Sequence, residues 1–135
     1  MSDSAALTLS DARAMLDRAI AHADALGVTV SIAIVDGSGV PVASARMDGA
    51  SFVSPEIALG KAWTAAAFKV PSGKVAESMA SAPAFASGVS AATHGRFMPR
   101  QGAIALDGGG AIGASGATSA QDEQIARAGA ASPTA

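Results

Sequence analysis

The sequence predicts a mixed α/β (α+β) fold, with a mostly antiparallel central sheet flanked by helices. Two β-hairpin patterns, at residues 28–46 and 102–117, are separated by helical patterns. Further helical patterns stand near both ends of the chain. The expected element order is therefore αββααββα, which differs from the alternating βαβ order of a doubly wound parallel sheet.

The first helix is expected over residues 9–26. Thr8 and Asp11 form a pair like a capping box, in which aspartate takes the place of the usual glutamate. Apolar residues then recur at helical spacing. Gly27 suits the left-handed position that commonly ends a helix, so we expect the helix to stop there.

A β-hairpin is expected next. Residues 28–35 are rich in β-branched side chains, which favour a strand. Residues 36–39 read Asp-Gly-Ser-Gly and supply a tight turn, after which residues 40–46 form the partner strand. Pro41 has no N–H to donate, so it must lie at the start of a strand or at a sheet edge.

Two helices and a long irregular stretch are expected in the middle of the chain. Residues 54–68 open with Ser-Pro-Glu, which combines an N-cap hydroxyl, a first-position proline and a first-turn carboxylate. Ser72 is expected to cap a shorter helix over residues 72–79. Residues 81–101 lose this periodicity and are too many for an idle connection, so we expect a lid or a partly ordered segment.

The last part of the chain predicts a second hairpin and a final helix. Segments 102–107 and 111–117 alternate in apolar character and are joined by three consecutive glycines. Ser119 and Asp122 match a capping box and are expected to open the last helix.

The composition indicates one domain with an unusual core. The chain has 135 residues, of which 50% are hydrophobic and only 4% aromatic, with no tyrosine. We expect a single domain over residues 1–135, with its core at about 7–131. Small side chains bury little area each but let backbones approach closely, which favours self-association. A high-GC codon bias would produce the same alanine excess without functional meaning.

Charge and residue types exclude several function classes. The net charge is -2 and the basic residues are scattered, so the basic stripe of a nucleic-acid-binding protein is missing. The absence of cysteine excludes disulfides and thiolate metal sites. The first residues lack the pattern of a signal peptide, and no apolar run approaches about 18 residues. We therefore expect a soluble cytoplasmic protein with no membrane or nucleic-acid partner.

Several motifs in the same order resemble the GlcG/HbpS family, which also occurs as the C-terminal domain of PduO-type proteins. They are residues 30–36 with Gly39, Ala45-Arg46-Met47-Asp48-Gly49-Ala50, Ile57-Ala58 with 61–65, Gly102, 112–117, and Asp122 with Ile125-Ala126. The resemblance implies a profilin-like fold and a homo-oligomer, which we expect to be a tetramer to octamer. It also implies binding of haem or a related tetrapyrrole, although many members have no assigned activity.

A haem protein needs an axial ligand and cations near the propionates. Because cysteine and tyrosine are absent, the axial-ligand candidates are His22, His94 and the methionines. His22 follows Arg18 by four residues in the first predicted helix, so the two share a face. We predict His22 as the metal ligand, with Arg18 as a neighbouring cofactor-binding cation. The alternative for His22 is a solvated histidine that interacts with the helix dipole.

His94 is a second cofactor-binding candidate. It lies in the irregular stretch beside Arg96, Phe97 and Met98, and such side chains are suited to line a tetrapyrrole. The alternative is an ordinary mobile loop. Because a two-fold interface repeats every group, we predict that one haem is shared by two subunits, each contributing His22.

Four charged residues are further candidates. Arg46 and Asp48 share a strand face if the strand extends that far, where they either pair with each other or form an anion or propionate site. Lys61 either serves such an anion or extends over apolar surface. Asp36 enters a glycine-rich turn, where its carboxylate is expected to accept from backbone amides.

Three functions follow from these candidates. The leading one is an oligomeric haem or tetrapyrrole-binding protein for haem storage or sensing, rather than an enzyme. The second is a lyase or isomerase of a catabolic operon, with Arg46 holding a carboxylate metabolite and Asp36 or Asp48 acting as base. The third is an accessory protein that handles a cobalamin-type corrinoid, as the PduO-type resemblance suggests.

Other site types are excluded by their patterns. The glycines at 108–110 join two strand segments, whereas a phosphate loop joins a strand to a helix. The sequence holds only two histidines, which excludes an all-histidine zinc site within one chain. A Gly-x-Ser-x-Gly elbow is also absent, which argues against a serine hydrolase.

Overall fold

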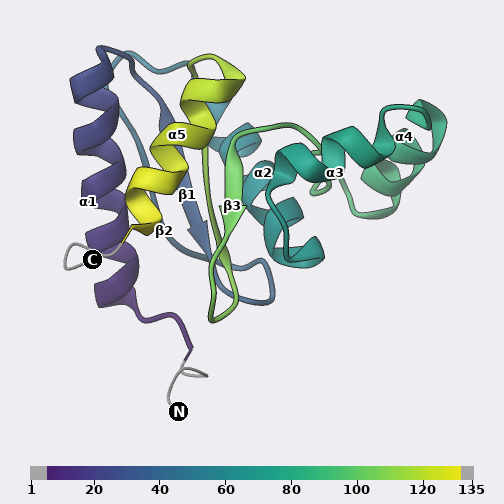
Figure 1. Cartoon of the computed structure of the whole chain (residues 1–135), viewed down its shortest axis with the longest axis horizontal. Coiled ribbons are helices and arrows are strands. Elements are labelled where there is room, and N and C mark those ends of the chain that lie inside the picture. The colour runs from purple at the N-terminus through teal and green to yellow at the C-terminus, as the bar shows by residue number, and fades with distance from the viewer. Residues whose placement is uncertain (1–5, 132–135) are drawn as a thin grey trace.

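A four-stranded antiparallel sheet organises the chain, and helices cover both of its faces (Figure 1). The computed structural model describes residues 6–131. The strands lie in the order β2-β1-β4-β3. Their bounds are Ser31–Val35 for β1, Pro41–Arg46 for β2, Ala103–Ala105 for β3 and Ala111–Ser115 for β4. The predicted fold class is confirmed, although β1 begins three residues later than predicted, at Ser31, where its residue pairing with β2 starts.

Five helices are present in the described range. They are α1 (Leu9–Leu26), α2 (Ser54–Phe68), α3 (Ser72–Met79), α4 (Pro83–Ala92) and α5 (Ser119–Ala130). One apolar cluster joins α1 and α5 to the sheet face that carries Ile32 and Ile34. A second cluster joins α2 to the face that carries Ala33 and Val35. Helices α1 and α5 thus lie on one face of the sheet and α2 on the other.

Small residues bring α2 close to the sheet. A Cβ atom added at Gly113 in β4 would lie 2.7 Å from the Ala58 carbonyl oxygen of α2. The α2 residues that face β1 and β4 are alanines at 58, 62, 65 and 66. The alanine and glycine of this sequence therefore permit a close helix-to-sheet contact that larger side chains would prevent.

The ends of α1 agree with the sequence. The Thr8 hydroxyl accepts a hydrogen bond from the Asp11 backbone N–H at 3.0 Å, as expected for an N-cap. Gly27 ends the helix with φ 74°. The predicted start and stop of this helix are confirmed.

The predicted capping residues of the other helices are wrong. Helix α5 is capped by Thr118, whose side chain and that of Gln121 satisfy each other's backbone N–H groups. Neither Ser54 nor Ser72 caps its helix. The Ser54 hydroxyl instead donates to the Ser51 carbonyl oxygen at 2.7 Å and contacts the Ser31 hydroxyl, and the Ser72 hydroxyl accepts from the backbone N–H of Ala103.

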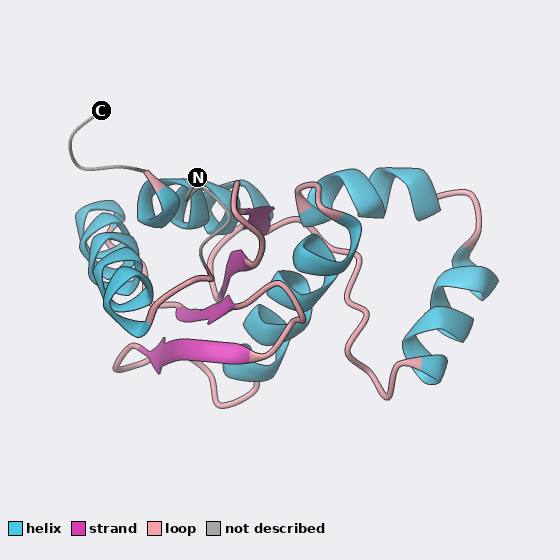
Figure 2. Cartoon of the chain, turned by 90° about the horizontal axis from the view of Figure 1, so that it is seen from below, coloured by secondary structure: helices cyan, strands magenta, loops and turns pink. Residues whose placement is uncertain are grey.

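Helix α4 was not predicted, because residues 81–101 were expected to form a lid or a partly ordered segment. Pro83 stands in the first turn of the helix, where its missing N–H costs nothing. No α4 residue is buried, and although Phe85, Val89 and Ala92 recur at helical spacing, the small residues around them make that pattern weak. Figures 1 and 2 show α3 and α4 extending away from the sheet.

No helix within residues 6–131 is both long enough and apolar enough to cross a membrane. Residues 1–5, on which the expectation of a cytoplasmic location partly rests, lie outside the described residues.

Candidate functional site

His22 lies on α1 with one ring nitrogen enclosed by protein. Its side chain is partly buried, and Nε2 is a buried polar atom with no hydrogen-bond partner in the described chain. A buried polar atom without a partner is unusual in a folded protein and costs about 1–3 kcal/mol. Because the His22 side chain is partly buried, the alternative of a fully solvated histidine does not describe it. A free imidazole nitrogen is also what a metal requires.

Arg18 precedes His22 by about one helical turn and links helix α1 to helix α5. Its Nε and Nη2 atoms both donate to the Gly129 carbonyl oxygen, at 3.1 and 2.8 Å. This contact joins α1 to the end of α5 and supplies donors to a carbonyl oxygen that the helix itself leaves without one. Arg18 therefore fixes the helix pair that carries His22, and part of its donor capacity is already used.

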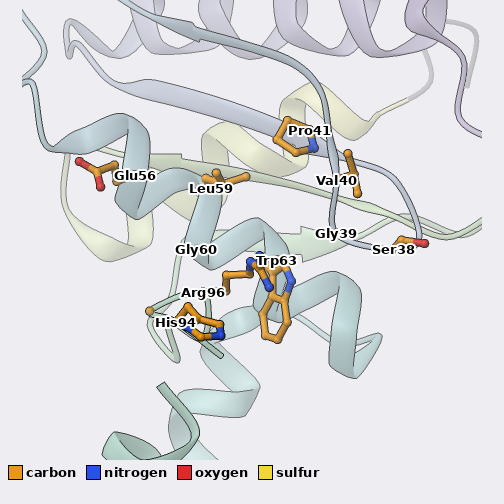
Figure 3. A pocket seen from close by; sticks show the side chains of 11 residues that line it. Ser38, Gly39, Val40, Pro41, Glu56, Leu59, Gly60, Trp63, His94 and Arg96 are labelled. Atoms are coloured by element: carbon orange, nitrogen blue, oxygen red, sulfur yellow. The ribbon is translucent and has the colours of Figure 1, made fainter. Parts of the chain in front are cut away.

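A groove of about 450 Å³ lies along α2, on the other side of the sheet (Figure 3). The β1–β2 turn forms one wall, α2 forms the floor, and the segment after α4 forms the other wall. The side chains that line it include Glu56, Leu59, Trp63, His94 and Arg96. The volume suits a small organic molecule.

A second lobe of about 410 Å³ adjoins this groove. It contains Arg46 and Ser44 from β2, and it shares Pro41, Glu56 and Leu59 with the first lobe. The structure thus brings Arg46 and His94, both predicted site residues, to neighbouring lobes of one groove. His22 and Arg18 lie apart from them, on the helix that covers the opposite face of the sheet.

Lys61 is not on the surface. Its side chain is 2% exposed, and its ammonium donates to the Ala114 carbonyl oxygen at 3.0 Å and to Asp122 Oδ2 at 3.1 Å. Burial lowers the pKa of Lys61, and the neighbouring Asp122 carboxylate opposes this effect. The interpretation of Lys61 as a cation extended over apolar surface is therefore wrong, because its charge is used inside the fold.

The two aspartates proposed as bases have different surroundings. Asp36 Oδ1 accepts from the backbone N–H groups of Ser38 and Val40, at 2.9 and 3.0 Å, so it holds the β1–β2 turn as expected. Asp48 is exposed and lies beyond β2, which ends at Arg46. The strand does not reach Asp48, so Arg46 and Asp48 do not share a strand face. In the described part of the chain, Arg46 and Asp48 form no ion pair with each other.

Trp63 and Glu56 were not predicted as groove residues, and Arg96 was named only as a neighbour of His94. A signal for the α2 residues was present. Glu56, Leu59, Gly60 and Trp63 recur at spacings of three and four, which places them on one helix face. Nothing in the sequence paired this face with residues 94–96, because that contact depends on the path of the chain after α4.

No group of three or more histidine, cysteine, aspartate or glutamate side chains within residues 6–131 is arranged to hold a metal ion. A metal at His22 would therefore have to arrive with ligands of its own, as the iron of a porphyrin does.

Comparison with known proteins identifies relatives over nearly the whole chain. The family model described as "Haem degrading protein HbpS-like" matches residues 7–131. The corrinoid adenosyltransferase PduO of Salmonella typhimurium (strain LT2) is 33% identical over 126 residues. That match covers 90% of this chain but only 37% of the length of PduO.

Two solved structures share the fold. A complex named PduOC:heme superposes with a TM-score of 0.81 at 33% identity, covering 93% of each chain. A double mutant of HbpS from Streptomyces reticuli superposes with a TM-score of 0.80 at 32% identity, covering 92% of this chain and 84% of the other. Together with the family model, these matches confirm the predicted resemblance, and the chain belongs to the HbpS-like family of haem degrading proteins.

Proposed function

We propose that this protein binds haem as a homo-oligomer, with His22 as an axial ligand to the iron. The observation that carries the proposal is the buried Nε2 atom of His22, which has no hydrogen-bond partner within residues 6–131. The relative solved as a PduOC:heme complex supports the choice of tetrapyrrole. Haem bound here would supply an iron centre able to accept ligands and electrons.

The residues around His22 fit this role. An imidazole without a hydrogen bond at Nε2 loses no protein hydrogen bond when it coordinates, but the His22 ring must first turn so that the enclosed Nε2 reaches the surface of α1. Arg18 holds α1 against α5 through Gly129, so the helix that presents the ligand is fixed. Arg18 also places a cation one turn from His22, which is favourable for a propionate.

The exposed face of α1 suits a shared cofactor. Ala14, Ala21 and Ala25 are exposed on this helix, so the surface beside His22 is formed largely by small side chains. A flat molecule can approach such a surface closely. A two-fold axis beside it would bring two copies of His22 to one haem. We propose a tetramer to octamer built from such pairs.

A second candidate is corrinoid handling. The relatives named corrinoid adenosyltransferase favour it, although the chain spans only 37% of their length. A corrinoid is also a metal-centred tetrapyrrole that histidine can ligate. His22 would then serve a different metal at the same place.

Titration of the purified protein with haemin and, separately, with cobalamin distinguishes these two functions. We expect haemin to give a saturable shift of its Soret band. A spectral change with cobalamin and none with haemin would support the corrinoid function. No saturable change with either molecule would contradict tetrapyrrole binding.

A further inference from the structure

The groove along α2 has one corner with a distinct chemistry, formed by Trp63, His94 and Arg96. Figure 3 shows the Arg96 side chain lying between the Trp63 indole and the His94 ring. In the described part of the chain, the Arg96 guanidinium forms no ion pair. Glu56, the acidic side chain among the residues that line this lobe, stands well away from the corner in the same view. The corner therefore holds a cation with free donors.

Hydrogen bonds and packing fix the segment that carries His94 and Arg96. The Thr64 hydroxyl of α2 accepts from the Met98 backbone N–H at 2.7 Å, and Thr93 Oγ1 accepts from the Phe97 N–H at 3.1 Å. Phe97 is buried, and its ring lies 5.6 Å from that of Phe68. The segment is attached to α2 at two places, Met98 to Thr64 and Phe97 to Phe68, so this wall of the groove has a fixed position.

The backbone at the corner is in a left-handed conformation. His94 has φ 58° and Gly95 has φ 80°. The N–H groups of His94 and Gly95 donate to the Ala91 and Ser90 carbonyl oxygens, so this left-handed turn also ends helix α4, as left-handed residues commonly do. Because Phe97 and Met98 are both fixed, the chain turns sharply at 94–95 and brings His94 and Arg96 to the groove.

The indole of Trp63 is held from the other side. Gly39, with φ 79°, lies so close that an added Cβ would be 2.5 Å from Trp63 Cδ1. Glycine at this place lets the β1–β2 turn lie against the ring. Trp63 thus stands between the turn and the corner as a flat wall that is only partly buried.

We propose that this corner is a binding site for a small carboxylate with a planar apolar part. A guanidinium donates two parallel hydrogen bonds to a carboxylate, and a neutral histidine can add one more. The Trp63 ring and Leu59 offer apolar surface for the remainder of the ligand. Glu56, farther along the groove, disfavours a second negative charge there. The site lies on the opposite side of the sheet from His22, so it does not depend on haem binding.

The single tryptophan makes a direct test available. Because the sequence contains one tryptophan, the indole N–H signal in an ¹H–¹⁵N NMR spectrum reports on Trp63 alone. We expect benzoate to shift this signal in a saturable way, and benzamide, which has the same shape without the charge, to shift it far less. Arg96 is exposed, so R96Q should weaken benzoate binding by about fivefold, the loss of one solvent-screened charge-assisted pair.

Matched variants separate the site from a general charge effect. R100Q removes a cation from the same loop outside the groove lining and should leave benzoate affinity within about twofold. R96K keeps the charge but loses the paired donors, so its affinity should fall between those of the unchanged protein and R96Q. H22A should bind benzoate like the unchanged protein. Equal shifts with benzamide, equal losses in R96Q and R100Q, or no saturable shift would each overturn the proposal.

Discussion

Lys61 and Asp122 form an ion pair in the interior, with 3.1 Å between Nζ and Oδ2 and side chains that are 2% and 4% exposed. The pair joins α2 to α5 past the end of β4, where Lys61 also donates to the Ala114 carbonyl oxygen. The second carboxylate oxygen of Asp122 accepts from the Ala117 N–H at 3.0 Å. Both charges are therefore satisfied inside the fold, and each depends on the other.

We predict that K61M destabilises the protein by about 3–5 kcal/mol, because the Asp122 carboxylate is left buried without its cation. Urea unfolding followed by circular dichroism measures this loss. K74M is the matched control: Lys74 and Glu77 are exposed and 4.0 Å apart, so its cost should stay below about 1 kcal/mol. Equal effects of the two variants would show that the buried pair is not a major contact.

The lowered pKa of Lys61 predicts a pH dependence with a definite sign. The folded protein releases the Lys61 proton at a lower pH than the unfolded chain does, because burial disfavours the ammonium. Between that lowered pKa and the value of an unfolded-chain lysine, about 10.4, the unfolded chain binds more protons. The contribution of Lys61 to the free energy of unfolding therefore rises with pH across this window.

K61M lacks this titration, so it isolates the effect. The difference in free energy of unfolding between the unchanged protein and K61M should grow as the pH is raised through the window. A difference that shrinks over this range would contradict the direction of the pKa shift.

A third prediction concerns the start of α5. T118A should lower stability by about 1 kcal/mol, because the hydroxyl that accepts from the Gln121 N–H at 3.1 Å is lost. S119A, one residue later, should change stability by less than about 0.5 kcal/mol. Thermal unfolding of the two variants compares the observed cap with the cap expected from sequence, and a larger loss in S119A would favour the latter.

The fold class, the two hairpins and the ends of α1 could be predicted because they depend on local patterns, whereas long-range contacts and the caps of the other helices could not. Ser54 and Ser72 had the sequence context of helix caps, but the Ser54 hydroxyl donates to the Ser51 carbonyl oxygen and contacts Ser31, and the Ser72 hydroxyl accepts from Ala103. Lys61 and Asp122 are far apart in sequence, and no local pattern links them. Helix α4 has no buried residue, and its apolar residues at helical spacing stand among small ones, so its pattern was weak. Local sequence propensity does not predict a structural feature that depends on tertiary contacts or on their absence.

The candidate sites divide in the same way. His22 and Arg18 could be named from their spacing on a helix, but the unpartnered state of Nε2 appears only when α1 is packed in the fold. On the α2 side of the groove, the helical spacing of Glu56, Leu59 and Trp63 could have predicted a shared face, but the groove was not predicted from it. Its other side depends on the turn at His94 and Gly95, which the irregular sequence did not predict.

We predict a homo-oligomer of more than two chains. Helix α4 carries no buried residue, and Phe85 within it is 62% exposed, so the single chain leaves apolar surface uncovered. Light scattering coupled to size-exclusion chromatography at micromolar concentration measures the molar mass. A stable monomer would contradict this prediction, and it would also leave a haem shared by two subunits without its second chain.

The most direct test of the central claim is a haemin titration of the unchanged protein, H22A and H94A, followed through the Soret band. If His22 coordinates the iron, H22A should lose the low-spin spectrum and bind haemin more weakly, whereas H94A should behave like the unchanged protein. The reverse pattern would place the ligand in the segment after α4. A low-spin spectrum that survives in H22A would contradict the account.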